Sequence, residues 1–194
     1  PMKDSIRETV FNILGQSVKG TVAIDLFAGT GILAIESLSR GSVHAIAIEK
    51  SGTAAKSIRN SADNIGIGSE LDVLTGDAFR IGPQRMRERQ EALDVEAANP
   101  DSANPDSKKS ETAGAPWIVY FCPPYSMWLE MPDKMFELIR AAATLAPPGS
   151  QLVVETDKFF DPETLPLEPW DIRRKGNVTL AFLELSTPTD TTPP

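Results

Sequence analysis

The 194-residue chain contains one cysteine and one histidine, and this scarcity limits the chemistry that it can support. An internal disulfide needs two cysteines, and a structural zinc site needs a cluster of cysteine and histidine ligands. Cys122 and His44 alone form neither of these. The sequence therefore predicts no internal disulfide, no metal site and a protein of the reducing cytoplasm.

Long apolar runs and positive charge are also scarce. No stretch approaches the roughly 20 apolar residues that span a bilayer, and the opening residues lack the apolar core of a signal peptide. The formal net charge of −8 excludes a broad basic surface that wraps nucleic acid, although a local basic patch is compatible with it. Because the chain opens on proline and helix-forming residues follow almost at once, we expect a further segment to precede it.

The residues that are present suffice for one α/β domain, since 41% of the chain is hydrophobic. Apolar periodicity predicts helices near residues 4–14, 32–40, 53–65 and 135–145. Short apolar runs predict strands over residues 22–27, 43–48, 71–74, 117–121, 151–155 and 179–185. Strands that alternate with helices are typical of an open, doubly wound and mostly parallel sheet.

Two segments have no apolar pattern. Residues 83–116 are charged and small, so we predict a flexible insertion there, with a short helix over residues 84–93. Such an insertion would be dispensable for folding. The Pro- and Thr-rich residues 187–194 are predicted to be a loose tail, which leaves residues 1–186 as a single domain.

Polar groups follow three of the predicted strands. Asp25-Leu-Phe-Ala-Gly-Thr-Gly31 ends the first, and its glycines let the backbone approach a ligand at a helix N-terminus. Glu49 ends the second strand, where a carboxylate can accept hydrogen bonds from both ribose hydroxyls, and Asp77 ends the third, where it can accept from an adenine amine. Each feature alone is equally consistent with a tight turn or a solvated acid. Together, at one edge of a parallel sheet, they predict a nucleotide-like ligand.

One alternative ligand follows from the same loop. Gly29-x-Gly31-x-x-Ala34 satisfies the looser dinucleotide fingerprint, so a nicotinamide-dependent oxidoreductase is a rival hypothesis. The sequence shows no second substrate domain and no evident partner for hydride transfer. The nicotinamide hypothesis is therefore the weaker of the two.

Three motifs follow one another along the first part of the chain. They are Pro1-x-x-Asp4-x-x-Arg7-Glu8-x-x-Phe11-Asn12-Ile13-Leu14, then Asp25 to Gly31, then Glu36-x-Leu38-Ser39-Arg40-Gly41. This series resembles the RsmD-type methyltransferases, which methylate the exocyclic amine of a guanine in small-subunit ribosomal RNA. The resemblance extends through Glu49, Gly76-Asp77-Ala78 and a Pro-Pro-Tyr motif to the last strand.

The resemblance implies a Rossmann-like methyltransferase fold with an antiparallel C-terminal strand and S-adenosylmethionine as cofactor. It implies ribosomal RNA, or a small-subunit assembly particle, as the cytoplasmic partner. It places the ribose on Glu49, next to Lys50, and the adenine near Asp77 and Ala78. The methionine moiety would lie near the first loop, at Asp25, Phe27, Ala28, Gly29, Thr30 and Gly31.

Cys122, Pro123, Pro124 and Tyr125 are the candidate catalytic residues. In the amine-methylating families this loop has Asp or Asn, two prolines, then Tyr or Phe. A side-chain oxygen and the carbonyl of the first proline accept the amine hydrogens, and the aromatic ring stacks on the flipped base.

Cys122 stands at the first position of that motif. A thiol is a weak acceptor, so we expect turnover to fall by ~10² to 10³ unless a neighbouring group compensates. A cofactor-binding protein with little turnover is thus a third hypothesis. Enzymes that methylate carbon 5 of cytosine place their nucleophilic cysteine after the proline, so Cys122 is predicted to be an inert, buried thiol.

Overall fold

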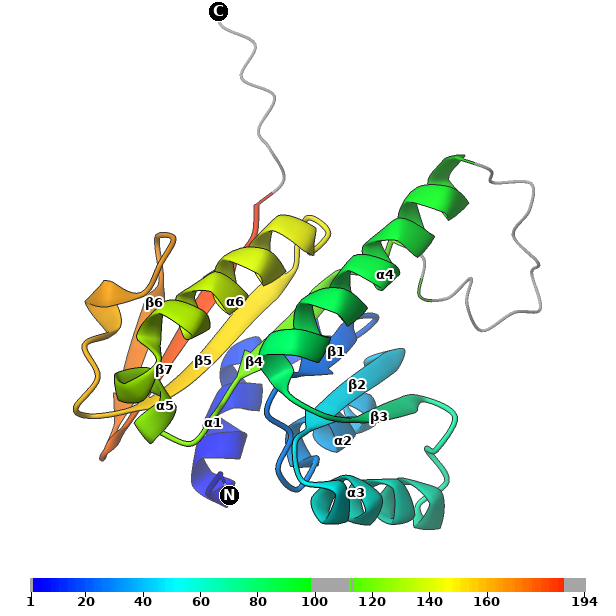
Figure 1. Ribbon diagram of the computed structural model, residues 1–194, viewed down its shortest axis with the longest axis horizontal. Coiled ribbons are helices and arrows are strands. Elements are labelled where there is room, and N and C mark those ends of the chain that lie inside the picture. Colours follow the sequence, from blue (N-terminus) through cyan, green and yellow to red (C-terminus); the bar gives the residue numbers. More distant parts are fainter. Residues whose placement is uncertain (1, 99–111, 113, 187–194) are drawn as a thin grey trace, which may run out of the picture.

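The computed structural model describes residues 2–98, 112 and 114–186, and these residues build a seven-stranded sheet in the order β3-β2-β1-β4-β5-β7-β6 (Figure 1). β1 to β5 pair in parallel, whereas β7 pairs antiparallel with both β5 and β6. The chain runs outward from β1 to β3 and returns to β4, so the order of the strands reverses between β1 and β4. The strands are β1 (Val22–Asp25), β2 (His44–Glu49), β3 (Leu71–Thr75), β4 (Trp117–Phe121), β5 (Gln151–Asp157), β6 (Asp171–Lys175) and β7 (Val178–Glu184).

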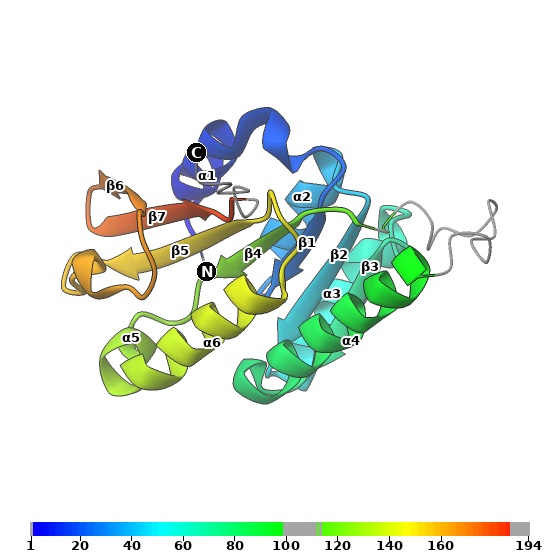
Figure 2. The same cartoon turned by 90° about the horizontal axis from the view of Figure 1, so that it is seen from above.

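Helices cover both faces of this sheet (Figure 2). α1 (Asp4–Leu14), α2 (Ile32–Ser39) and α3 (Gly52–Asn64) pack on one face. α4 (Ala78–Ala98), α5 (Ser126–Glu130) and α6 (Pro132–Leu145) pack on the other. Because both faces are covered, every residue of β1 and β4 is buried, which explains why these strands are continuous apolar runs. The predicted doubly wound sheet with an antiparallel C-terminal strand is confirmed.

The predicted flexible insertion is wrong over its first half, because α4 continues through residues 83–98. Pro83 lies inside this helix, where it removes a backbone donor. Packing outweighs that cost. Met86 is buried in the core, and Gly82 brings α4 so close to β1 that a Cβ there would lie 3.0 Å from a methyl group of Leu26. The short helix predicted over residues 84–93 is therefore part of a longer, packed one.

The end of the same segment is also anchored. Arg89 of α4 donates a hydrogen bond to the carbonyl of Thr112 at 3.1 Å, and Ala115 is buried just before β4. Residues 99–111 and 113 of the predicted insertion, and the predicted tail at 187–194, lie outside the described residues.

One described strand and one described α-helix were not predicted. β6 is mostly exposed at the edge of the sheet, and its Asp-Ile-Arg-Arg-Lys sequence has no apolar pattern. α5 is a single short helix that follows the Pro-Pro-Tyr loop. Within the part of the chain that the structure describes, no helix has the length and apolar character needed to cross a membrane.

Candidate functional site

The loop after β1 is shaped by two glycines in the left-handed region of the backbone. Gly29 has a φ of 55° and Gly31 a φ of 77°. A Cβ at Gly31 would lie 2.7 Å from Ile58 of α3, so this glycine lets the helix close on the loop. A Cβ at Gly29 would meet no protein atom within 4 Å. The backbone on that side of the loop is therefore accessible to a ligand.

Glu49 joins the end of β2 to this glycine loop. Its Oε2 accepts the Gly29 N–H at 2.8 Å, and its Oε1 accepts the Ser51 N–H at 2.8 Å. The Ala28 N–H donates to the Ile48 carbonyl at 2.9 Å, which fixes the loop on β2 a second time. A carboxylate has about four acceptor positions, so Glu49 can also accept hydrogens from a diol.

The end of β3 meets the same edge of the sheet. Asp77 accepts the Phe79 N–H through Oδ1 at 2.8 Å and so caps the start of α4, where Ala78 is buried. The Phe79 ring packs edge-on against Phe27 from the β1 loop, with the ring centres 5.9 Å apart. The structure thus brings the predicted cofactor residues to one edge of the sheet. Thr30 and Lys50 are exposed there.

Asp25 is the buried acid of this edge, with 1% of its surface exposed. Burial, against the lowering effect of the Phe27 N–H and with a smaller contribution from the carboxylates of Glu49 and Glu155, raises the pKa of Asp25 to about 7. A buried carboxyl that titrates near neutral pH becomes more acidic when a positive group approaches. The edge therefore favours a cationic ligand.

The Cys-Pro-Pro-Tyr loop follows β4, directly across the point where the strand order reverses. Pro123 is buried, Pro124 is exposed, and Cys122 and Tyr125 are partly buried. Burial raises the pKa of the Cys122 thiol well above its ordinary value, and the carboxylates of Glu155 and Asp25 add to this effect. The thiol is therefore neutral near pH 7, which agrees with the expected inert cysteine.

Glu155, near the carboxyl end of β5, is a candidate site residue that the sequence analysis missed. It is 5% exposed, and its Oε1 accepts the hydroxyl of Tyr125 at 2.6 Å. Burial raises the pKa of Glu155, and the Tyr125 hydroxyl and the nearby Cys122 thiol lower it in part. An acid that follows a buried apolar run at a strand end is the same pattern as Glu49, so the sequence did contain a signal for it.

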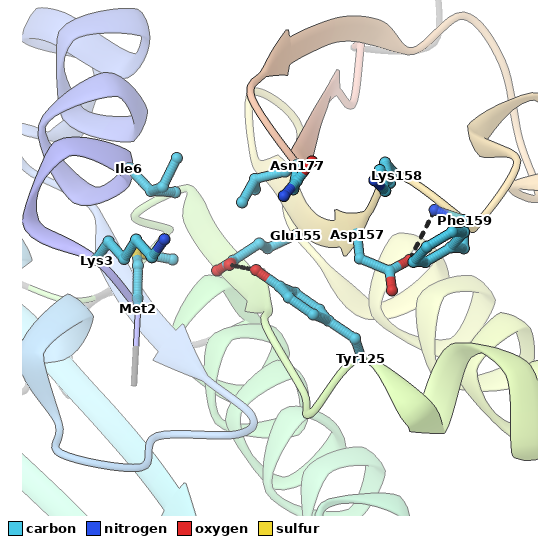
Figure 3. Close-up of a pocket in the computed structure, with 10 residues that line it drawn as sticks. Met2, Lys3, Ile6, Tyr125, Glu155, Asp157, Lys158, Phe159 and Asn177 are labelled. Atoms are coloured by element: carbon cyan, nitrogen blue, oxygen red, sulfur yellow. Dashed lines mark hydrogen bonds between the residues drawn. The ribbon is translucent and has the colours of Figure 1, made fainter.

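A pocket of about 430 Å³ lies beside Tyr125 and Glu155 (Figure 3). The start of α1 borders it on one side. The carboxyl end of β5 and the turn between β6 and β7 border it on the other. The glycine loop is not among the segments that line it. Its volume falls within the range of small-molecule sites. A second hollow of about 310 Å³ shares Lys158 and Phe159 with the pocket and is also lined by Arg174.

The fold and the site together define a class of protein. The sheet order, the antiparallel β7 and the glycine loop at the reversal point are those of the Rossmann-like methyltransferases. The structure named "Putative methyltransferase yhhF", from Escherichia coli, superposes with a TM-score of 0.62 at 21% identity, over 96% of this chain and 89% of that one. An RNA methyltransferase of Salinibacter ruber in complex with S-adenosyl-L-homocysteine gives a TM-score of 0.61 at 16% identity, over 98% and 97%. At these identities the likeness establishes the fold.

The family follows from the sequence. Residues 1–100 match the family described as Conserved hypothetical protein 95, which is the RsmD family, and the chain belongs to it. The Bacillus subtilis (strain 168) protein named "Putative rRNA methyltransferase YlbH" is 34% identical over 80 residues. That match covers 41% of this chain and 44% of the relative, so it spans less than half the length of the curated relative.

Proposed function

We propose that this protein transfers a methyl group from S-adenosylmethionine to the exocyclic amine of a guanine in small-subunit ribosomal RNA. One observation carries the proposal: a single edge of the sheet holds a glycine loop tied to Glu49 and, across the reversal point, a Pro-Pro-Tyr loop. Family membership supports it, as do a relative named as an rRNA methyltransferase and a similar fold bound to S-adenosyl-L-homocysteine.

The residues at the first three strand ends fit the methyl donor. S-adenosylmethionine supplies an electrophilic methyl group on a positively charged sulfur. Glu49 would accept the ribose hydroxyls, and the open backbone at Gly29 would lie against the methionine moiety. Asp77 would accept the adenine amine. Asp25, with its pKa of about 7, would ionise in response to the positive charge of the donor.

The Pro-Pro-Tyr loop fits the acceptor. The lone pair of an exocyclic amine is delocalised into the base, so hydrogen-bond acceptors must localise it before it attacks a methyl group. The carbonyl of Pro123 would supply one acceptor, and the ring of Tyr125 would stack on a base turned out of its helix. The thiol of Cys122 is a weak acceptor, so a second hydrogen-bond acceptor for the amine must come from another residue.

Local positive charge supports a nucleic-acid substrate despite the net charge of −8. Lys3 and Lys158 line the pocket beside Tyr125, and Arg174 lines the adjoining hollow. Phosphate contacts need such side chains near the site and not over the whole surface. An RNA strand that enters the pocket would pass these three residues.

Calorimetric titration with S-adenosylmethionine, S-adenosylhomocysteine, NAD and NADP tests the donor site. We expect the first two to bind and the nicotinamide cofactors not to bind. Glu49→Ala leaves polar partners unmatched and should weaken binding by about 1–3 kcal/mol, or roughly 5- to 150-fold in Kd. Glu184→Ala, at the opposite edge of the sheet, is the matched control and should bind as the unchanged protein does.

Two results would contradict the proposal. Tight binding of NAD or NADP, with none of S-adenosylmethionine, would favour the nicotinamide-dependent hypothesis. Binding of S-adenosylmethionine without methyl transfer to any ribosomal RNA or particle would favour the cofactor-binding protein without turnover.

A further inference from the structure

The carboxylate of Glu155 lies beside Cys122 at adjacent strand ends. β4 and β5 pair in parallel with Tyr120 opposite Val153, so the positions two residues further along are Cys122 and Glu155. Both side chains lie on the α1 face of the sheet, as Tyr120 and Val153 do. The Glu155 carboxylate, a strong hydrogen-bond acceptor, therefore lies next to the Cys122 thiol, a weak one.

We propose that Glu155 is a catalytic residue: its carboxylate accepts a hydrogen bond from the target amine and takes up the proton that the amine loses during methyl transfer. The assignment rests on the proposed function, since it names the acceptor group of that same site.

The surroundings of Glu155 hold its carboxylate in place. Tyr125 donates its hydroxyl to Oε1 at 2.6 Å, and Trp128 donates Nε1 to the backbone carbonyl of Glu155 at 2.9 Å. The exposed 5% of Glu155 faces the 430 Å³ pocket (Figure 3). Tyr125 uses one of about four acceptor positions, so the carboxylate can accept further hydrogens from the pocket. Such an acceptor is preorganised before the substrate arrives.

The reaction balances with Glu155 as proton acceptor. The amine lone pair forms the new nitrogen–carbon bond, and the bond from the methyl carbon to the sulfonium sulfur breaks with its electron pair left on sulfur. The nitrogen gains positive charge as the methyl group arrives, and one of its protons passes to the Glu155 carboxylate and then to water. The products are the methylated amine and the neutral thioether S-adenosylhomocysteine.

Charged and titratable groups around Glu155 tune this step. Burial raises the pKa of Glu155, and the hydrogen bond from Tyr125 and the nearby thiol of Cys122 lower it in part. The Glu155 carboxylate also contributes to the raised pKa of Asp25 on β1, so these two acids lie close together. The other ionisable groups of the pocket are Asp157, Lys158 and Lys3. A carboxylate with a raised pKa is a better proton acceptor near neutral pH than an exposed one.

The same carboxylate would select the base. Guanine presents its N1–H and its 2-amine side by side as donors, and a carboxylate offers two oxygens with matching geometry. Inosine lacks the 2-amine and keeps the rest of that edge. Glu155 is therefore expected to distinguish the two nucleosides.

Glu155→Gln is the main test, because an amide oxygen can still accept the Tyr125 hydroxyl but cannot take up the amine proton. We expect kcat to fall by ~10² to 10³, with the Kd of S-adenosylmethionine unchanged. Glu184→Gln makes the same change on β7 at the opposite edge and should leave kcat unaltered. Cys122→Asp should change kcat little alone and restore about tenfold in the Glu155→Gln background.

A merely structural role gives a different pattern. If Glu155 only positions Tyr125, Glu155→Gln keeps full kcat while Tyr125→Phe slows the enzyme, and that result would overturn the assignment. An equal response to Cys122→Asp in both backgrounds would overturn it as well.

Nucleoside binding provides a readout that needs no turnover. Guanosine and inosine are titrated into protein loaded with S-adenosylhomocysteine, and binding is followed by NMR chemical shifts. We expect guanosine to bind about tenfold more tightly, and Glu155→Ala to remove this preference. If the protein binds the cofactor but methylates no RNA, the proposed function fails, and equal affinities for the two nucleosides would then refute the role of Glu155 separately.

Discussion

Replacing Asp25 with Asn should remove a large part of the pH dependence of stability. The pKa of this buried carboxyl is raised from 3.8 to about 7, a difference of about 3 units. The folded state therefore holds a proton over a range in which the unfolded state has lost it. The contribution of Asp25 to the free energy of unfolding is therefore fully present below pH 3.8 and is lost as the pH rises through 7, by up to about 4 kcal/mol in total.

Urea denaturation at pH 5 and pH 8 measures this effect. Most of the 4 kcal/mol is lost between pH 5 and pH 8. The free energy of unfolding of the unchanged protein should therefore fall by about 3 kcal/mol more than that of Asp25→Asn over this range. Asn can still accept the Phe27 N–H, so the loop after β1 should remain intact. Equal losses in the two proteins would refute the argument that burial raises the pKa of Asp25.

Three further changes test the packing and the RNA-facing surface. Gly31→Ala combines a left-handed φ with a Cβ 2.7 Å from Ile58, so we expect a loss of about 2 kcal/mol or more in thermal or urea unfolding, and unchanged stability would show that this contact relaxes freely. Met86→Ala should cost about 2–5 kcal/mol because the side chain is buried, whereas a neutral result would mean that α4 does not pack on the core. Lys158→Glu should weaken binding of ribosomal RNA and reduce the slope of log affinity against log salt by about 1, and an unaltered slope would remove Lys158 from the interface.

Much of the fold could be predicted because burial on both faces leaves a strong pattern in the sequence. β1 and β4 are fully buried, and each is an apolar run closed by polar or turn residues. β6 gives no such pattern, because most of its residues are exposed. Its place in the sheet comes from its antiparallel pairing with β7. The pairing of β6 with β7 across the two-residue turn at Gly176 and Asn177 forms this edge strand without burial of its side chains.

α4 shows why composition alone was misleading. From Pro83 onward α4 is mostly charged and polar with no clear apolar stripe, so its composition suggested a loop, although Arg, Gln, Glu and Ala are good helix formers. The contacts of Gly82 and Met86 with the core are formed only in the folded chain, and they offset the cost of Pro83 inside the helix. That residues 83–116 are dispensable for folding stays a prediction, and the buried side chain of Met86 argues against it for the part of α4 around that residue.

The candidate site was predicted in part for a related reason. Residues next to a recognisable motif, such as Glu49 beside the glycine loop, could be placed from strand ends and spacing. Glu155 is distant from any motif, and its link to Tyr125 arises because β4 and β5 are neighbours in the sheet. The weak acceptor at Cys122 was visible in the sequence, and Glu155 has the pattern of a strand-end acid, but only the pairing of β4 with β5 shows that the two residues are neighbours.

Methyl transfer to ribosomal RNA is the most direct test of the central claim. The protein is incubated with tritiated S-adenosylmethionine and either ribosomal RNA or small-subunit particles from cells that lack it, and the labelled RNA is digested to nucleosides and mapped by mass. We predict that the label appears in N2-methylguanosine at a defined position of the small-subunit RNA. Absence of label from both substrates, or label on a carbon or a ribose and not on the guanine amine, would contradict the account.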